Sequence, residues 1–276
     1  MTCVVFGASG QIGHYLLSYL RARRMATVAF SRASQADDTD VIWQHGRLPD
    51  AVPALPEQVS AIVCLGPLDH FSHWLQHAEV TGSPRIVAMS SMSAESKRHS
   101  PDPAERELAA RLRESEERLL TRCAEWGSGC TILRATLIYG GAGGSLEKMA
   151  ARARRRHVFP LPRGRGLRQP VHADDLARAV LAALDKPQAT GVICIGGGER
   201  LSATMMFARA RKALAPGVPC LPLPQAALRG VAAVSGRGRG MAARLEQDLV
   251  TDNTELVNLL GVQPRPFEPG LTSWKG

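Results

Sequence analysis

The stretch from Thr2 to Gly13, TCVVFGASGQIG, decides the fold of this chain. Its first five residues, TCVVF, form a short apolar run that is typical of a buried strand. Glycines follow at positions 7, 10 and 13, and apolar side chains then recur at helical spacing from Ile12 to Arg24. A strand, a glycine-rich turn and a helix in this order predict the first unit of a doubly wound α/β sheet.

The glycine-rich turn also indicates a dinucleotide site. Missing side chains allow a tight turn, a close approach of the backbone to a pyrophosphate, and close packing of the helix on the strand. The start of the helix adds free N–H groups and a partial positive charge. The residues expected to hold a dinucleotide here are Gly7, Ser9, Gly10, Gln11, Ile12 and Gly13. The alternative is a turn that kept its shape and lost its ligand.

The end of the second expected strand, Thr27 to Phe30, bears on the choice of dinucleotide. Ser31 and Arg32 follow it, and no carboxylate occurs before Asp37. An NAD site usually has an acidic residue here for the ribose 2′-hydroxyl, whereas a hydroxyl and a guanidinium suit a 2′-phosphate. The sequence therefore predicts that NADP(H) is preferred over NAD(H). The alternative is an ordinary surface arginine.

The rest of the chain divides into two parts. Residues 1–140 alternate short β-branched runs with helical patterns, which predicts a Rossmann-type parallel sheet with helices on both faces. Further strands are expected at Ala61–Leu65, Arg85–Met89 and Thr131–Leu133, with a helix from Pro103 to Trp126 capped by Asp102. Residues 141–276 are richer in Gly, Pro and Arg and are expected to form a smaller C-terminal α/β substrate lobe, with a strand near 192–195 returning to the main sheet. Helices are expected at Ser202–Leu214 and Met241–Leu249, and Arg237–Gly240 is expected to be flexible.

Several stretches, taken in order, resemble the short-chain dehydrogenase/reductase superfamily, in its extended, NAD-dependent epimerase/dehydratase-like branch. They are the glycine turn, Cys64–Gly66, Val87–Ser91, Ile132–Gly140 and Gly164–Ala177. The resemblance implies that Ser91 is the active-site serine. It also implies that Leu65, Gly66, Ser90 and Ala135 lie beside the cofactor, with Ala135 replacing the usual proline.

The catalytic pair of that family, Tyr-x-x-x-Lys, is missing. The chain has three tyrosines, Tyr15, Tyr19 and Tyr139, and none has a lysine four residues later. Placing Glu117 and Leu120 on the family's E-x-x-L pattern puts Ala109 at the tyrosine position and Arg113 at the lysine position. Arg113 is then expected to hold the cofactor ribose, unless it is a surface arginine.

The resemblance therefore implies an atypical member of the family. One interpretation is an NAD(P)-dependent oxidoreductase or epimerase with a degraded catalytic motif, acting on a small substrate. The other is a non-catalytic NADP(H)-binding sensor, regulator or assembly factor. The missing pair favours the second interpretation, whereas Ser91, the histidines near His70 and the basic loop of the second lobe favour the first, which we expect.

Other residues are candidates for proton transfer. His70 follows the strand that should end at the cofactor, and Lys97 follows the strand that carries Ser91. A polar helix surface and a solvated loop, respectively, are the alternatives. His73 and His77 have the spacing of a metal pair but lack the glutamate of H-E-x-x-H, so no metal site is predicted. Asp175, near the start of a later helix, is expected to cap it.

Composition bounds the partners. The net charge is +9, and arginines gather between Arg152 and Arg168. Arg163, Arg165 and Arg168 lie where the enzymes that the chain resembles bind the anionic part of a substrate, which implies an acidic or phosphorylated small molecule. A solvated basic face is the alternative. Nucleic acid is not expected, because no aromatic residues interleave with the arginines to stack on bases.

The cysteines and the apolar stretches exclude other classes. The six cysteines form no C-x-x-C pair, so neither a disulfide framework nor a cysteine zinc site is expected. No apolar stretch approaches the roughly 20 residues of a membrane span, and no export signal is recognised. We therefore expect a cytoplasmic protein, and an arginine-, alanine- and glycine-rich composition is typical of a GC-rich bacterial genome. The family habit of pairing helices across a two-fold axis leaves a homodimer open.

Overall fold

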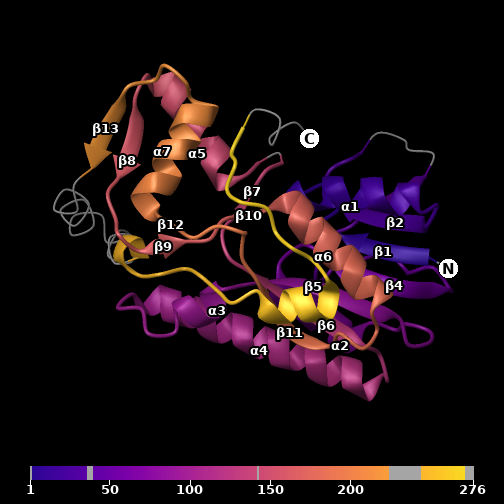
Figure 1. Cartoon of the computed structure of the whole chain (residues 1–276). Coiled ribbons are helices and arrows are strands. Elements are labelled where there is room, and N and C mark those ends of the chain that lie inside the picture. The colour runs from indigo at the N-terminus through magenta and orange to yellow at the C-terminus, as the bar shows by residue number, and fades with distance from the viewer. Residues whose placement is uncertain (1, 36–39, 142, 224–243, 271–276) are drawn as a thin grey trace.

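Seven parallel strands form the central sheet of the computed structural model, which describes residues 2–35, 40–141, 143–223 and 244–270 (Figure 1). The strands are β1 (Thr2–Phe6), β2 (Ala26–Ser31), β3 (Val41–His45), β4 (Val59–Cys64), β5 (Arg85–Ser91), β6 (Cys130–Ala135) and β11 (Gly191–Ile195). Their order across the sheet is β11-β6-β5-β4-β1-β2-β3, so the direction of winding reverses between β1 and β4. Ligands of open α/β sheets bind at such a reversal, beyond the carboxyl ends of the strands.

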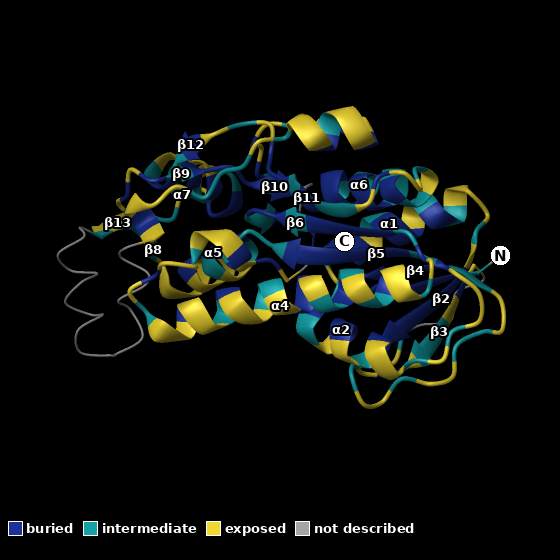
Figure 2. Cartoon of the chain, turned by 90° about the horizontal axis from the view of Figure 1, so that it is seen from below, coloured by how far each residue is buried: buried dark blue, intermediate teal, exposed yellow. Residues whose placement is uncertain are grey.

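Helices cover both faces of this sheet. Strand β1 shows why, because its alternate residues belong to two different cores: Cys3 and Val5 to one, Val4 and Phe6 to the other. The first core is closed by α1 (Gln11–Ala22), α6 (Ala173–Asp185) and the π-helix η1 (Leu256–Leu260). The second is closed by α2 (Leu68–His77) and α4 (Pro103–Glu125). Figure 2 shows the buried strands between these layers and the exposed outer side of α4. The predicted doubly wound α/β fold is confirmed.

Local signals placed most of the elements. Asp102 accepts a hydrogen bond from the Ala104 N–H at 3.0 Å, with Pro103 in the first turn of α4, as the sequence predicts. Strand β3 was not predicted. The predicted helix Met241–Leu249 is partly wrong: its first three residues lie outside the described part, and Leu249 instead donates its N–H to the Leu167 carbonyl. The expected flexible stretch Arg237–Gly240 also lies outside the described residues.

The second lobe has its own small core. Its elements are β7 (Ile138–Tyr139), α5 (Ser145–Arg156), β8 (Phe159–Pro162), β9 (Leu167–Arg168), β10 (Val171–His172), β12 (Leu201–Ser202), α7 (Ala203–Leu214) and β13 (Cys220–Leu223). Leu146, Phe159 and Met206 bring α5, β8 and α7 together in this core. Strand β13 pairs with β8 in parallel, and β12 pairs with β9 antiparallel. Strand β11 pairs with β6 of the main sheet, and α6 packs on a face of that sheet. Both elements lie between segments of the second lobe in the sequence, so the chain crosses from one lobe to the other more than once (Figure 1).

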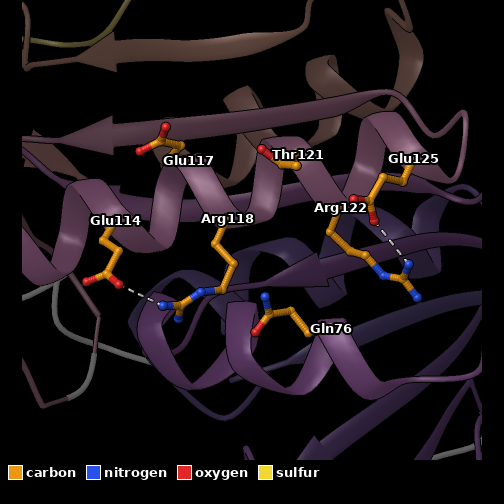
Figure 3. Close-up of a pocket in the computed structure, with 7 residues that line it drawn as sticks. All are labelled: Gln76, Glu114, Glu117, Arg118, Thr121, Arg122 and Glu125. Atoms are coloured by element: carbon orange, nitrogen blue, oxygen red, sulfur yellow. Dashed lines mark hydrogen bonds and ion pairs between the residues drawn. The ribbon is translucent and has the colours of Figure 1, made fainter.

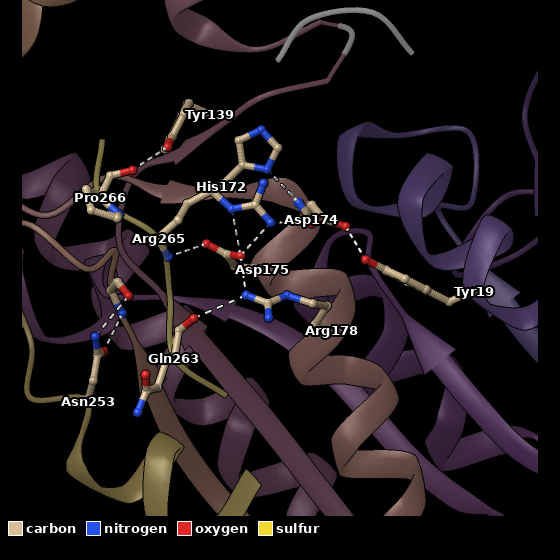
Figure 4. A network of polar contacts seen from close by, with 11 residues as sticks. Tyr19, Tyr139, His172, Asp174, Asp175, Arg178, Asn253, Gln263, Arg265 and Pro266 are labelled. Carbon is tan, nitrogen blue, oxygen red and sulfur yellow. Dashed lines mark hydrogen bonds and ion pairs between the residues drawn. The ribbon is translucent and has the colours of Figure 1, made fainter. Parts of the chain in front are cut away.

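A buried carboxylate ties the C-terminal segment to α6. Asp175 is fully buried and accepts hydrogen bonds from the Arg265 N–H at 2.9 Å, from Arg265 Nε at 3.0 Å and from an Arg178 nitrogen at 2.6 Å (Figure 4). The neighbouring Asp174 accepts from the Tyr19 hydroxyl of α1 at 2.6 Å. The expected cap of α6 is therefore supplied by another residue: His172 Nδ1 accepts from the Asp174 N–H at 3.1 Å. Asp175 instead fastens residues 263–265 against the helix.

No helix within the described ranges is both long and apolar enough to span a bilayer.

Candidate functional site

A cavity of about 310 Å³ lies beyond the carboxyl ends of β1, β2, β3 and β4. We call it the cofactor cavity. It is lined by Phe6, Gly7, Ser9, Gly10, Phe30, Ser31, Arg32, Gly46, Arg47, Leu48, Leu65, Gly66, Pro67 and His70. Most of the residues that the sequence predicts to hold a dinucleotide therefore surround one space.

The three glycines of the turn have three different environments. Gly7 has φ +78°, and a Cβ there would lie 3.0 Å from the Gly66 nitrogen. A Cβ on Gly13 would lie 2.1 Å from the Ala8 oxygen, so Gly13 allows α1 to pack closely on the turn. Gly10 is exposed, and its Cβ would meet only the Gly7 oxygen, at 3.2 Å. A tight turn, close helix packing and an open backbone are the features that a pyrophosphate site requires.

Two arginines line this cavity with guanidinium groups that have no partner in the described part of the chain. Arg32 follows β2 and Arg47 follows β3, and both are exposed. Neither guanidinium has a hydrogen bond or an ion pair with any residue in the described ranges. Ser31 lines the same cavity and is buried, with its hydroxyl oxygen accepting from the Ala33 N–H at 3.2 Å. Sequence reasoning missed Arg47, since recognition of VIWQH as a strand was the signal needed to place it at this edge.

A second cavity, of about 660 Å³, lies between the carboxyl ends of β5 and β6 and the second lobe. We call it the substrate cleft. Its polar lining is Gln11, Ser91, Ser93, Ser96, Lys97, Thr136, Ser145, Arg168, Arg244, Gln247 and Asp248. Its apolar lining is Met92, Leu137, Ile138, Met206, Phe207, Leu245 and Leu249. Ser91 and Lys97 thus line the same space, and their catalytic roles stay predictions.

The short helix α3 (Ser93–Ser96) positions these two residues. The Ser93 N–H donates to Ser91 Oγ at 3.1 Å, which leaves the Ser91 hydroxyl hydrogen free to donate. Lys97 Nζ lies 3.6 Å from the buried carboxylate of Glu105, which also accepts from the Ser100 hydroxyl at 2.7 Å. Arg244 Nε pairs with the same carboxylate at 3.0 Å. Glu105 therefore joins α4 to the segment that closes the far side of the cleft.

Arg168 differs from its predicted role. It is 7% exposed, and its guanidinium donates to the backbone carbonyls of Gln247, at 2.7 Å, and of Arg244. Burial lowers the pKa of this guanidinium. Arg168 thus holds residues 244–247 in place, while Arg163 and Arg165 are exposed and line neither cavity. The three arginines expected to bind one anionic group are not brought together.

Ser90 also differs from its predicted role. Its hydroxyl donates to Glu116 at 2.5 Å, and Glu116 pairs with Arg134 inside the protein. The Ser90 side chain therefore supports β5 and faces no cavity described above. Ala135 is buried at the end of β6.

The helix α4 carries Ala109 and Arg113 at the positions of the missing pair. Ala109 is fully buried. Arg113 is half-buried, and its Nε is buried without a hydrogen-bond partner in the described chain. Arg113 lines neither the cofactor cavity nor the substrate cleft, so its contact with a cofactor ribose stays a prediction.

His70 lies in the other cavity from Ser91 and Lys97. It is exposed on α2 and lines the cofactor cavity beside Leu65 and Pro67. The His73 and His77 rings do lie together, with centroids 5.4 Å apart. Among the described residues no group of His, Cys, Asp and Glu is arranged to hold a metal ion.

A third hollow, of about 360 Å³, lies on the surface between α2 and α4 (Figure 3). It is lined by Gln76, Glu114, Glu117, Arg118, Thr121, Arg122 and Glu125. Arg118 pairs with Glu114 at 3.0 Å, and Arg122 pairs with Glu125 at 3.3 Å. Its two arginines thus already have partners on their own helix, which is typical of a solvated helix surface.

Comparisons with known proteins agree with this geometry. Residues 75–196, less than half of the chain, match the model of the NAD dependent epimerase/dehydratase family. No curated protein sequence matches the chain. The predicted likeness to the extended, NAD-dependent epimerase/dehydratase branch is confirmed.

Solved structures resemble the whole chain. A UDP-N-acetylglucosamine 4-epimerase from Bacillus cereus is 14% identical, with a TM-score of 0.69, and 99% of this chain covers 94% of it. A UDP-glucose 4-epimerase from Thermotoga maritima is 16% identical, with a TM-score of 0.71 and coverage of 99% and 97%. An NAD dependent NDP-hexosamine 5,6-dehydratase involved in tunicamycin biosynthesis is 16% identical, with a TM-score of 0.74 and coverage of 99% and 96%. At these identities the likeness establishes the fold.

Proposed function

We propose that this chain binds NADP(H) in the cofactor cavity and acts as an epimerase-like oxidoreductase on a small molecule in the substrate cleft. The observation that carries the proposal is the pair of cavities along the carboxyl edge of one parallel sheet. The glycine turn and two unpartnered arginines line one of them, and Ser91 and Lys97 line the other.

The preference for NADP(H) rests on Ser31, Arg32 and Arg47. A 2′-phosphate carries charge that NAD(H) lacks, and guanidinium groups bind phosphate oxygens through two parallel hydrogen bonds. Because Arg32 and Arg47 face the cofactor cavity without a protein partner, a phosphate there would not have to displace an existing contact.

The groups in the cleft can handle the proton that accompanies hydride transfer. When bound, the dinucleotide supplies or accepts the hydride at a substrate carbon. In the reducing direction the Ser91 hydroxyl donates a hydrogen bond to the substrate carbonyl oxygen. The Lys97 ammonium gives that oxygen a proton and becomes a neutral amine. Glu105 positions the ammonium beforehand.

A non-catalytic NADP(H)-binding sensor, regulator or assembly factor is the second candidate. The observation that favours it is Ala109, which is fully buried and carries no group able to exchange a proton. In that case the cofactor cavity would bind NADP(H) and the cleft would support no turnover.

A fluorescence titration with NADPH and, separately, NADH tests cofactor binding. We expect tighter binding of NADPH, and an affinity for NADPH that is about tenfold lower in Arg32→Ala while that for NADH is unchanged. Arg165→Ala, which removes an exposed arginine that lines neither cavity, is the matched control. Equal affinity for the two cofactors would refute the NADP(H) preference.

Turnover separates the two candidate functions. With NADPH and a panel of aldehydes, ketones and nucleotide sugars, we expect Lys97→Met to lower turnover by about 100-fold without changing NADPH affinity. Ser91→Ala should lower turnover less, since it removes one hydrogen bond and no proton donor. Unchanged turnover in Lys97→Met would refute the role of that lysine, and NADPH binding without turnover on the panel would favour the sensor.

A further inference from the structure

A groove of about 520 Å³ lies between α5 and the two strands β8 and β13 of the second lobe. We call it the α5 groove. It is lined by Ser145, Lys148, Met149, Arg152, Ala153, Arg156, Val158, Pro160 and Leu221. Phe159 lies between Val158 and Pro160 in the sequence and is buried in the core of the lobe. Because neighbouring residues of a strand point to opposite faces, the groove lies on the face of β8 that is turned away from this core.

Three cations form a row along one wall of the groove. Lys148, Arg152 and Arg156 are spaced four residues apart on α5, which places them on one helix face, and all three are exposed. None has a hydrogen bond or an ion pair with a residue in the described ranges, and no carboxylate is among the lining residues. The acid on the same helix, Glu147, instead accepts from the Gly143 N–H at 2.7 Å.

These cations repel one another, and no carboxylate of the described residues pairs with them. Arg154, on the same helix, shows the contrast, because its guanidinium donates to the Leu214 carbonyl and belongs to the scaffold of the lobe. A row of like charges that lacks such contacts favours an anion as its partner.

The other side of the groove is apolar. Met149, Val158, Pro160 and Leu221 line it, and Leu221 is 53% exposed. An inorganic anion alone would leave this surface in water. A nucleic acid would need aromatic side chains for its bases, and none is among the lining residues. The ligand that fits both sides has an anionic head and an alkyl chain.

We propose that the α5 groove binds a single anionic amphiphile, such as an alkyl phosphate or a lipid of that type. Its phosphate or carboxylate lies among Lys148, Arg152 and Arg156, and its alkyl chain covers Met149, Val158 and Leu221. Ser145 lines both this groove and the substrate cleft, so the bound amphiphile lies beside the cleft. The proposal does not depend on the proposed cofactor or reaction.

Isothermal titration calorimetry of the whole protein tests this site, with dodecyl phosphate below its critical micelle concentration as the probe. We expect saturable binding of one molecule, with an affinity about tenfold lower in the double variant Arg152→Gln/Arg156→Gln. Arg155→Gln is the matched control, because Arg155 is exposed on the same helix and does not line the groove. Leu221→Ser, at an exposed position that leaves the core intact, should weaken binding several-fold through the alkyl chain.

Head-group and chain probes sharpen the test. Inorganic phosphate and dodecyl maltoside, which carry the head alone and the chain alone, should each bind at least tenfold more weakly than dodecyl phosphate. Equal affinity of inorganic phosphate, or equal losses in Arg155→Gln and in the double variant, would overturn the proposal. The proposal would also be overturned if the protein sedimented with phosphatidylglycerol vesicles but did not bind monomeric dodecyl phosphate. The partner would then be a membrane surface.

Discussion

The cofactor cavity and the substrate cleft treat their cations in opposite ways. Arg32 and Arg47 in the cofactor cavity have no protein partner in the described chain. In the substrate cleft, Lys97 and Arg244 share the Glu105 carboxylate, and Arg168 donates to backbone carbonyls. Guanidinium and ammonium groups that already have partners contribute to the shape of a site more than to the binding of a ligand. This difference supports the proposal that the cofactor cavity recognises an anion, whereas Arg168 and Arg244 hold the walls of the cleft.

The largest effect should come from the turn that supports the cofactor cavity. Gly13→Ala puts a Cβ 2.1 Å from the Ala8 oxygen, a backbone atom that cannot move without distorting the turn. We expect the free energy of unfolding to fall by about 3 kcal/mol, as for an overpacked core. Urea unfolding followed by circular dichroism measures it. The sign is diagnostic, because alanine in place of glycine inside a helix otherwise stabilises by about 1 kcal/mol.

Gly66→Ala is the matched control for this change. Gly66 also lines the cofactor cavity, but a Cβ there has no heavy atom within 4 Å. Its free energy of unfolding should stay within about 0.5 kcal/mol of the wild type. If Gly13→Ala were as stable as Gly66→Ala, the close contact between α1 and the turn would not limit the fold.

The second effect concerns the shared carboxylate of the cleft. Glu105→Gln keeps an acceptor for the Ser100 hydroxyl but removes the negative charge that pairs with Lys97 and Arg244. We expect a loss of about 2 kcal/mol in the free energy of unfolding, less than for a fully buried pair because Arg244 is 45% exposed to solvent.

Anion binding to this variant would remove the difference between the cofactor cavity and the substrate cleft. The loss of the carboxylate charge beside Lys97 should make inorganic phosphate raise the melting temperature of Glu105→Gln more than that of the wild type, whose cofactor cavity and α5 groove also carry cations. A rise of equal size in the two proteins would mean that the cleft binds no additional phosphate when Glu105 loses its charge.

Local features explain what the sequence predicted well. The glycine turn, the cap Asp102 and the apolar runs of β1 and β5 depend only on neighbouring residues, and each was placed correctly. Strand β3 was missed because only one of its five residues, Val41, is buried, so VIWQH shows neither an apolar run nor a clear alternation. Arg47 was missed with it.

Contacts between distant segments explain the rest. Arg168 meets backbone carbonyls 76 and 79 positions away, and Asp175 meets Arg265 at a separation of 90. No local pattern distinguishes such an arginine from one that faces a ligand. Sequence therefore predicted the fold and the conformation of the glycine turn, whereas the contacts of Ser90, Arg168 and Asp175 required the tertiary structure.

The third effect tests the free cations directly. Arg47→Ala should lower NADPH affinity by about tenfold, or 1.4 kcal/mol, without lowering NADH affinity. The backbone contacts of Arg47 with Ala51, at 2.7 and 2.9 Å, do not depend on the side chain, so the free energy of unfolding should not change. Fluorescence titration with both cofactors measures the ratio. Equal weakening of both would mean that Arg47 contacts a part that the two dinucleotides share.

The smallest effect concerns His172, which packs between elements of the main sheet layer and of the second lobe. The buried His172 ring lies 5.5 Å from the Tyr15 ring of α1 and 5.0 Å from the Tyr139 ring of β7. Burial lowers the pKa of His172, and the nearby Arg265 lowers it further. The folded protein therefore binds this proton less readily than the unfolded chain, whose histidine titrates at about 6.5. Stability should thus fall as the pH drops below that ordinary value, since protonation removes the Nδ1 acceptor that caps α6.

His172→Asn isolates this contribution, because asparagine keeps a capping oxygen and does not titrate. The difference in the free energy of unfolding between wild type and His172→Asn, measured by urea at pH 7.5 and at pH 5.5, should shift in favour of the variant at the lower pH. The other titrating groups are common to both proteins and cancel in this difference. A difference that stays constant between the two pH values would mean that His172 does not titrate differently in the folded and unfolded states. The surroundings of His172, beside the rings of Tyr15 and Tyr139, would then accommodate a charged imidazole and would be more polar than their burial indicates.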